Sequence, residues 1–342
     1  MKFYLSLLIV TVSLLLPNFV YAQKKLVSNA AKYRLLKKIA IGGEGSWDYP
    51  AFDGKNHRLY ISHETEVVVV DTVRCAIVGR IPNASGVHGI APVPAFGKVF
   101  ISEGEADAVG VFDLRTLSPL GKINSGKAPD AIIYDSVTKR LFTSNGDSAD
   151  MTAIKASNGE VIGTISIGGD PESIAVDGKG QLFLAIADKN EIVTIDTKKL
   201  VVKNRWAITG CEVPKSVALD VKNKRLFVGC RNRLLAVMDA GNGRTISTIP
   251  IGERVDTTVF DPATKMIFNS CGDGTVYIIH EDSPDKFSLV EIVQTLPGAK
   301  TMAYDSATKQ FFLPVAENFQ AADAATGQKA MAGNFVLLIF GQ

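Results

Sequence analysis

The sequence predicts an all-β fold in which seven copies of one four-stranded unit close into a ring, and three observations support this prediction. An apolar strand, a turn and a second apolar strand recur together every 40 to 44 residues. The copies hold four short apolar or alternating segments separated by Gly, Pro and Asp. The 3.6-residue periodicity of helical repeats is absent. Four short strands in a period of this length are typical of one blade of a β-propeller, so we expect a seven-bladed β-propeller.

The first strand of each copy sets the register of the repeat. It ends at Asp in six copies and at Val93 in the second copy, where Pro92 and Pro94 replace the usual turn. These reference positions are Asp53, Val93, Asp135, Asp177, Asp220, Asp261 and Asp305. Because a single blade cannot bury both of its faces, neighbouring blades must cover it.

The other three strands of each copy follow at nearly constant offsets. The second strand reads RLYIS, KVFIS, RLFTS, QLFLA, RLFVG, MIFNS and QFFLP. The third strand ends in Asp in several copies, for example VVVVD at Asp71, although Lys155 takes that place in the third copy. The fourth strand alternates apolar and polar residues and ends near Gly or Pro, as in VIGTISI.

The two ends of the chain complement each other. The last copy supplies three strands, at 301–305, 310–314 and 334–340. Residues 34–41 (RLLKKIAI), followed by Gly-Gly, match the fourth strand of the other copies. We therefore expect the N-terminal strand to close the last blade, which protects the sheet edges of the ring.

Residues 1–22 are typical of a secretory signal peptide. Lys2 precedes an apolar stretch at 5–16 that is short for a membrane span, and Pro17 and Val20-Tyr21-Ala22 follow it. An uncleaved anchor is the alternative. No later segment has 18 consecutive apolar residues, so we expect no membrane span in the mature chain. The sequence thus predicts an exported protein, periplasmic or secreted, with one propeller domain at 23–342.

Composition and motifs exclude several classes of function. The formal net charge is +2, from 37 basic and 35 acidic residues, and no basic stripe supports binding of nucleic acid. Nucleophile-elbow, Walker, dinucleotide-binding and zinc-protease motifs are absent. Four cysteines, Cys75, Cys211, Cys230 and Cys271, show no metal spacing. An exported protein can form disulfides, and the three pairings stay open.

The repeated second strand, the Asp-Thr pairs at 71–72 and 196–197, and the segment IGGDPESIAVD resemble the YVTN-type repeat. From about Leu35 to Phe340 the chain is similar to YncE-like seven-bladed propellers. This resemblance implies the propeller fold. It implies a function of a general kind, since such propellers are mostly binding proteins, with some lactonases or lyases among their relatives.

Residues at equivalent positions of the blades should form rings around the central channel. The residue five places before each reference position is ionisable in all seven copies. We refer to these residues as the charge ring: Asp48, His88, Asp130, Glu172, Lys215, Asp256 and Lys300. Charged entrances to strands are common on protein surfaces, but propeller mouths are also frequent ligand sites. We expect the charge ring to line a ligand-binding mouth.

A second ring is predicted from the residue after each second strand: His63, Glu103, Asn145, Ile186, Cys230, Cys271 and Val315. Its polar members, His63, Glu103 and Asn145, are further candidates for the ligand-binding mouth. His63, His88 and Glu103, beside Asp48, have the nitrogen and oxygen atoms that zinc or a similar ion prefers. They form the candidate metal set, and a divalent metal is the candidate cofactor. His57 and His280 are expected at the surface of the opposite face.

Two further features point to the predicted mouth. The loop at 315–333 is much longer than its counterparts and suggests a lid, a binding loop or a disordered insertion. Trp47, beside Asp48, either stacks on a ligand at the mouth or packs between the seventh and first blades.

Three functions are compatible with these features. The leading hypothesis is a non-enzymatic binding or scaffold protein, acting as a monomer, that holds a small molecule, a polymer or a protein partner at the channel mouth. The alternative is a metal-assisted lactonase- or lyase-like enzyme with its site at the same mouth. A third is a protein partner in envelope assembly that uses the loop at 315–333.

Overall fold

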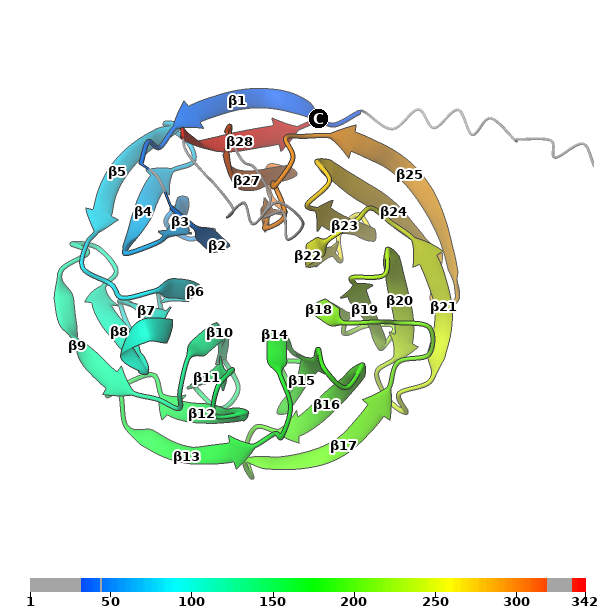
Figure 1. Ribbon diagram of the computed structural model, residues 1–342, viewed down its shortest axis with the longest axis horizontal. Helices are drawn as coiled ribbons and strands as arrows, with labels where there is room; N and C mark the ends of the chain where they lie inside the picture. Colours follow the sequence, from blue (N-terminus) through cyan, green and yellow to red (C-terminus); the bar gives the residue numbers. More distant parts are fainter. Residues whose placement is uncertain (1–31, 44, 319–333) are drawn as a thin grey trace, which may run out of the picture. The chain divides into compact units, whose positions relative to one another are not determined.

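The computed structural model describes residues 32–43, 45–318 and 334–342. In these residues the chain forms seven sheets of four antiparallel strands, arranged in a ring (Figure 1). The one helical element described is a single 3-10 turn, η1 (Gly104–Ala106). The predicted all-β, seven-bladed β-propeller is therefore confirmed. Among the described residues there is also no helix of the length and apolar character that a membrane span needs.

Six blades follow the order of the chain from the innermost strand to the outermost. Blade 1 comprises β2 (Trp47–Asp53), β3 (Arg58–His63), β4 (Glu66–Asp71) and β5 (Ala76–Ile81). Blade 2 comprises β6 (Val87–Val93), β7 (Lys98–Glu103), β8 (Ala108–Asp113) and β9 (Pro119–Asn124). Blade 3 comprises β10 (Pro129–Asp135), β11 (Arg140–Asn145), β12 (Asp150–Lys155) and β13 (Val161–Ser166).

The next three blades repeat this arrangement. Blade 4 comprises β14 (Pro171–Val176), β15 (Gln181–Ile186), β16 (Glu191–Asp196) and β17 (Val201–Ala207). Blade 5 comprises β18 (Pro214–Asp220), β19 (Arg225–Cys230), β20 (Leu234–Asp239) and β21 (Thr245–Pro250). Blade 6 comprises β22 (Val255–Asp261), β23 (Met266–Cys271), β24 (Thr275–Ser283) and β25 (Lys286–Gln294).

Blade 7 joins both ends of the described chain. It comprises β26 (Ala303–Asp305), β27 (Gln310–Ala316), β28 (Phe335–Gly341) and β1 (Arg34–Ala40). β1 is the outermost strand and pairs antiparallel with β28, from Arg34 opposite Gly341 to Ala40 opposite Val336 (Figure 1). The predicted closure of the last blade by the N-terminal strand is confirmed.

An Asp ends five of the inner strands and directly follows β14, and in these six blades it stabilises the turn to the next strand. Its Oδ1 accepts a hydrogen bond from the backbone N–H two residues later, at 2.7 to 3.2 Å. Such Asx turns satisfy a backbone donor with a local side chain. In blade 2 the turn after Val93 instead uses a backbone bond from Phe96 N to the Val93 carbonyl, at 3.0 Å.

The Arg that opens several second strands connects neighbouring blades. Arg58 of blade 1 donates to the Leu114 carbonyl of blade 2, at 2.7 Å. Arg140 makes the same contact to Thr197 of blade 4, at 2.6 Å. Arg225 does so to Pro284 of blade 6, at 2.8 Å. The aromatic side chain two residues after this position is buried in all seven blades and forms the core between them: Tyr60, Phe100, Phe142, Phe183, Phe227, Phe268 and Phe312.

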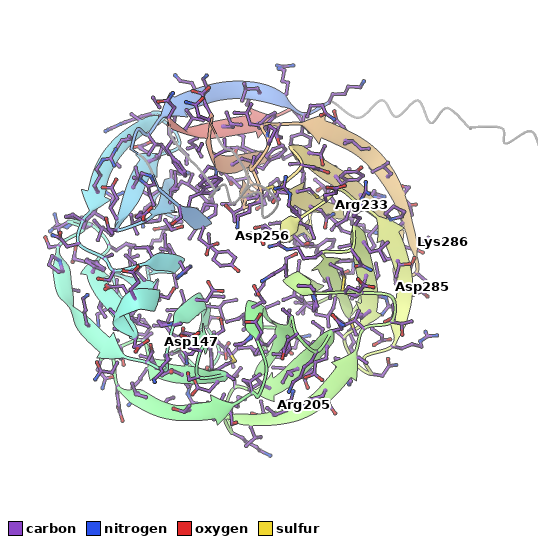
Figure 2. The ribbon with its side chains drawn as sticks, in the orientation of Figure 1. Asp147, Arg205, Arg233, Asp256, Asp285 and Lys286 are labelled. Atoms are coloured by element: carbon purple, nitrogen blue, oxygen red, sulfur yellow. A yellow bond between two sulfur atoms is a disulfide. The ribbon has the colours of Figure 1, made fainter. Side chains whose placement is uncertain are left out.

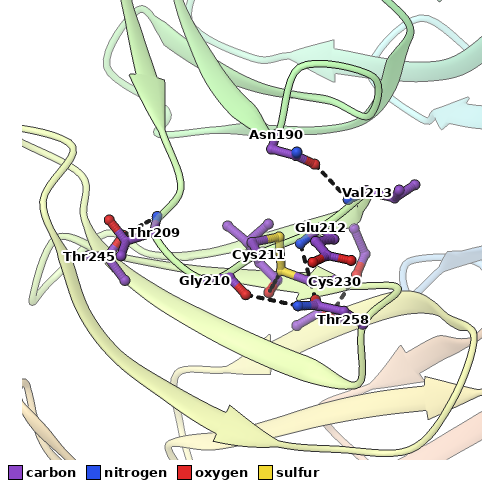
Figure 3. Close-up of a disulfide and its surroundings, with 12 residues drawn as sticks. Asn190, Thr209, Gly210, Cys211, Glu212, Val213, Cys230, Thr245 and Thr258 are labelled. Carbon is purple, nitrogen blue, oxygen red and sulfur yellow. Dashed lines mark hydrogen bonds between the residues drawn. A yellow bond between two sulfur atoms is a disulfide. The ribbon is translucent and has the colours of Figure 1, made fainter.

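One disulfide, Cys211–Cys230, is present in the described part of the chain (Figure 3). It ties the connection between blades 4 and 5 to the end of β19, while Cys75 and Cys271 are free. Hydrogen bonds from Thr209 N to Thr245 Oγ1 and from Val213 N to Asn190 Oδ1, at 3.1 and 2.7 Å, hold the same connection.

We expect the Cys211→Ser/Cys230→Ser double variant to be less stable by about 3 kcal/mol, because the bond closes a loop with a sequence separation of 19. The free energy of unfolding from denaturant titration measures this, and reduction of the wild type should reproduce it. Cys75→Ser is the matched control. Equal stability of the double variant and the wild type would contradict the expectation.

Candidate functional site

The charge-ring residues sit on β-bulges at the start of the inner strands. In blade 1, Asp48 and Tyr49 both lie opposite Ser62, because the register shifts between Trp47 and Pro50. The register shifts at the same place in blades 2 to 6. In blade 7, Lys300 directly precedes the inner strand. A bulge locally redirects the side chains of a strand, and here it repeats at the ring position of six blades.

Small hydroxyl residues on the second strands support these bulges. The Ser62 hydroxyl accepts a hydrogen bond from Asp48 N at 2.8 Å. The Ser102 hydroxyl accepts one from Gly89 N at 2.7 Å and donates to the backbone carbonyl of Asp130 in the next blade. Ser270 bonds in the same way to the Lys300 carbonyl, at 2.6 Å. The buried hydroxyls of Ser102 and Ser270 connect adjacent blades beside the ring.

In blades 1 to 3 the side chains of the charge ring meet around His88. Its Nδ1 lies 2.8 Å from Asp48 Oδ2 and 3.7 Å from Asp130 Oδ1. The His88 side chain is 43% exposed, so the group is accessible to solvent. The hydrogen bond to Asp48 raises the pKa of His88 above its ordinary value, burial opposes this rise, and the charge of Asp130 adds to it.

In blades 4 to 7 the charge ring forms ion pairs across blade boundaries. Lys215 pairs with Glu172 of blade 4. The Asp256 carboxylate forms ion pairs with Lys300 Nζ of blade 7, at 2.6 Å, and with Arg231 Nη2 of blade 5, at 2.9 Å. Asp256 lies at the inner end of blade 6, near the ring axis (Figure 2). Four contacts thus join charge-ring residues of different blades: Asp48–His88, His88–Asp130, Glu172–Lys215 and Asp256–Lys300.

Tyr49 is a member of this site that the sequence analysis missed. Burial raises its pKa well above the ordinary value, and the carboxylates of four blades raise it further: Asp130, Asp48, Asp256 and Glu172. Its phenol therefore lies within electrostatic reach of carboxylates from blades 1, 3, 4 and 6. The equivalent residues of the other blades are all small: Gly89, Ala131, Ser173, Ser216, Thr257 and Thr301. This contrast in the sequence could have identified Tyr49, since six small residues leave room near the axis for one large side chain.

Asp130 is the carboxylate of the charge ring whose negative charge is compensated by the fewest hydrogen bonds and ion pairs. Its Oδ1 is buried and makes no hydrogen bond to the described residues. Burial raises its pKa well above the ordinary value, and the nearby charges of Asp48 and Glu172 raise it further. Burial likewise raises the pKa of Glu172, against the effect of Lys215. Burial thus disfavours the charged form of both Asp130 and Glu172, on the neighbouring blades 3 and 4.

The second predicted ring does not line the axis. All seven of its members are at most 4% exposed, and the polar ones have partners on the outer strands of their own blades. His63 stacks on Phe335 with ring centroids 4.5 Å apart, and its Nδ1 lies 3.4 Å from Glu66. Glu103 pairs with Lys122 of β9. The placement of both residues at the mouth is therefore corrected.

Asn145, the third polar member, is equally buried. Its Nδ2 donates to Asp150 at 2.7 Å and to Thr152 at 2.9 Å, both on β12. The predicted metal set of His63, His88 and Glu103 is consequently not brought together. Within the described residues, the group of three that lies close enough to share an ion is Asp48, His88 and Asp130, with ligand atoms within 4.8 Å of one another.

The remaining candidates at the predicted mouth have different outcomes. Trp47 is 8% exposed and packs edge-on against Phe335 of blade 7, at 5.2 Å between ring centroids, which matches the packing alternative. Most of the loop predicted at 315–333 lies outside the described residues, and so does the predicted signal peptide at 1–22.

A groove of about 430 Å³ lies at the outer rim between β1 and β25. Its lining includes Tyr33, Leu35, Glu291 and Ile292. Leu35 and Ile292 are 49% and 40% exposed, so the groove presents apolar surface to solvent. It is a second place where a ligand could bind, and sequence analysis gave no sign of it because its two strands come from opposite ends of the chain.

Comparisons with known proteins agree with the fold. The chain is similar to Kuenenia stuttgartiensis hydrazine synthase, with a TM-score of 0.70 and 14% identity, over 86% of this chain and 95% of that one. It is 23% identical over 218 residues to antigen Lp49 of Leptospira interrogans, which covers 58% of this chain. That match spans 46% of the antigen's length. No family model matches the chain. At these identities the likeness to hydrazine synthase shows a shared propeller fold.

Proposed function

We propose that this chain is an exported binding protein whose charge ring holds a small molecule or a segment of a partner protein. The observation behind the proposal is the convergence of ionisable side chains from all seven blades, with contacts across five blade boundaries. Several of these groups are partly exposed, such as Lys300 at 34% and Asp130 at 26%. A rigid ring with convergent polar groups is a usual setting for ligand binding.

The proposal also includes export of the protein and its membership of the YncE-like propellers. The apolar stretch in residues 1–22 supports a secretory signal, and the Cys211–Cys230 disulfide is of a kind that persists in oxidising compartments. The repeated strand pattern supports a place among YncE-like propellers. We also propose that the mature protein acts as a monomer, since the ring has paired its own closing strand.

The enzymatic alternative has less support from the geometry. It requires His63 and Glu103 beside His88 and Asp48. Instead, His63 is buried against Glu66 of blade 1 and Phe335 of blade 7, and Glu103 is buried beside Lys122 of blade 2. Asp48 and His88 do form a hydrogen-bonded acid–base pair at 2.8 Å. One such pair without the other two groups favours binding over catalysis.

A thermal-shift screen with sugars, lactones, amines and carboxylic acids tests the proposal. We expect a compound that stabilises the wild type to bind at least tenfold more weakly to Tyr49→Ala and Lys300→Ala. Lys286→Ala, which lies at the outer rim (Figure 2), is the matched control and should bind as the wild type does. Binding that survives both ring variants but is lost in Ile292→Asp would move the site to the rim groove.

A further inference from the structure

Three potential metal ligands meet at the inner ends of blades 1 to 3. Nδ1 of His88 lies 2.8 Å from Asp48 Oδ2 and 3.7 Å from Asp130 Oδ1, and all three atoms lie within 4.8 Å of one another. Ligand atoms that share one ion at about 2.0 to 2.2 Å are roughly 3 to 4 Å apart. Small side-chain rotations would therefore bring the three atoms into coordination.

The charges around these atoms are unbalanced. Glu172 and Asp256, on blades 4 and 6, are paired with lysine or arginine. Asp48 and Asp130 share one imidazole instead. The buried Asp130 Oδ1 stays beyond hydrogen-bond distance of every donor that the structure describes. A buried carboxylate oxygen without a donor is costly unless a ligand compensates it.

The backbone around the three residues is held in place. The Ser102 hydroxyl bonds to Gly89 N and to the Asp130 carbonyl, so blades 2 and 3 are joined next to His88. A side chain at Gly89 would come within 2.6 Å of that carbonyl, so a glycine permits this close approach. The Thr301 hydroxyl donates to the Asp48 carbonyl at 3.0 Å. Such supporting contacts orient metal ligands before the ion binds.

We propose that Asp48, His88 and Asp130 bind one divalent transition-metal ion of the zinc class, with one oxygen from each carboxylate and Nδ1 of His88. The inference rests on the proposed function, because it names the first ligand of the same site. The imidazole nitrogen favours zinc over calcium. Three protein ligands leave a coordination position for water or for a donor atom of a second ligand, next to Tyr49.

The experiment is calorimetric titration of the full, EDTA-treated protein with ZnCl₂ and, separately, CaCl₂. We expect one equivalent of Zn²⁺ to bind, and to bind more tightly than Ca²⁺. Asp130→Asn and His88→Gln should each weaken Zn²⁺ binding at least tenfold. Glu160→Gln, which changes an exposed carboxylate of blade 3 outside the charge ring, is the matched control and should leave the affinity unchanged. Visible absorption of bound Co²⁺ should change in His88→Gln if the imidazole is a ligand.

Two results would overturn the proposal: no stoichiometric Zn²⁺ binding by the folded wild type, or equal Zn²⁺ affinity in the wild type, Asp130→Asn and His88→Gln. Thermal unfolding curves show whether each variant is folded. Failure here is distinct from failure of the proposed function. An organic ligand that needs Tyr49 and Lys300 in a protein without Zn²⁺ affinity would refute the metal site and keep the binding role.

Discussion

Removal of residues 23–42 is expected to abolish cooperative folding. This deletion takes away β1, the outermost strand of blade 7, and leaves the edge of β28 unpaired. It also removes three side chains of the core, Tyr33, Ile39 and Ile41, each at most 9% exposed. Burial of a large apolar side chain contributes about 1.5 to 3 kcal/mol, so the three together approach the total stability of many domains.

The closing strand also binds blade 1. Arg80 of β5 donates to the Ile41 carbonyl at 2.8 Å, so the deletion breaks contacts on both sides of blade 7. Circular dichroism during heating and size-exclusion chromatography measure the result: we expect a broad or absent transition and aggregated protein. Lys37→Ala, an exposed substitution that keeps β1, is the control and should melt as the wild type does. A soluble deletion variant with the wild-type melting temperature would contradict the role of β1.

The fold could be predicted because its determinants are local and repeated. Each Asx turn needs one Asp at one place, and each contact between blades made by Arg58, Arg140 or Arg225 needs one Arg at the start of a second strand. The same residues therefore recur with the period of the blade. The pairing of β1 with β28 could be predicted because the last copy has only three strands and the N-terminal segment matches the missing fourth strand.

The candidate site could be predicted in part. Equivalent first-strand positions lie at the same radius in every blade, so the charge ring converges. The second ring failed because strand neighbours decide which way a side chain points. The polar members of this ring contact residues on the third and fourth strands of their blades. His63 contacts Glu66, Glu103 pairs with Lys122, and Asn145 donates to Thr152. The disulfide pairing depends on distances between loops, which the repeat does not encode.

A buried carboxyl group between blades 5 and 6 leads to the second large expected effect. Glu281 on β24 is fully buried, Asn223 donates to its Oε1 at 3.3 Å, and its Oε2 has no partner among the described residues. Burial raises the pKa of Glu281 to about 7, and the neighbouring Asp220 contributes to the rise. At the equivalent position between blades 3 and 4, Thr197 donates to Asp135 at 2.8 Å. The carboxyl pair thus replaces a hydrogen bond between a hydroxyl and a single carboxyl group.

The native Glu281 carboxyl group makes the free energy of unfolding depend on pH in a defined direction. Below about pH 4.5 Glu281 is protonated in both the folded and the unfolded chain, so it has no effect. As the pH rises toward 7, the unfolded chain loses the proton first, and the folded state becomes less stable. A pKa raised to about 7 corresponds to a destabilisation of about 3 kcal/mol above that pH, as an upper bound.

Glu281→Gln and Glu281→Thr are therefore expected to stabilise the protein at pH 8 by up to about 3 kcal/mol and to change little at pH 4.5. Glutamine keeps the shape without a charge, and threonine copies the junction between blades 3 and 4. Denaturant titrations at both pH values measure the effect, with the exposed Glu105→Gln as the control. A stabilisation of equal size at both pH values would mean that packing at this junction, rather than the proton on Glu281, sets the difference, because only a titrating group makes the gain grow between pH 4.5 and 8.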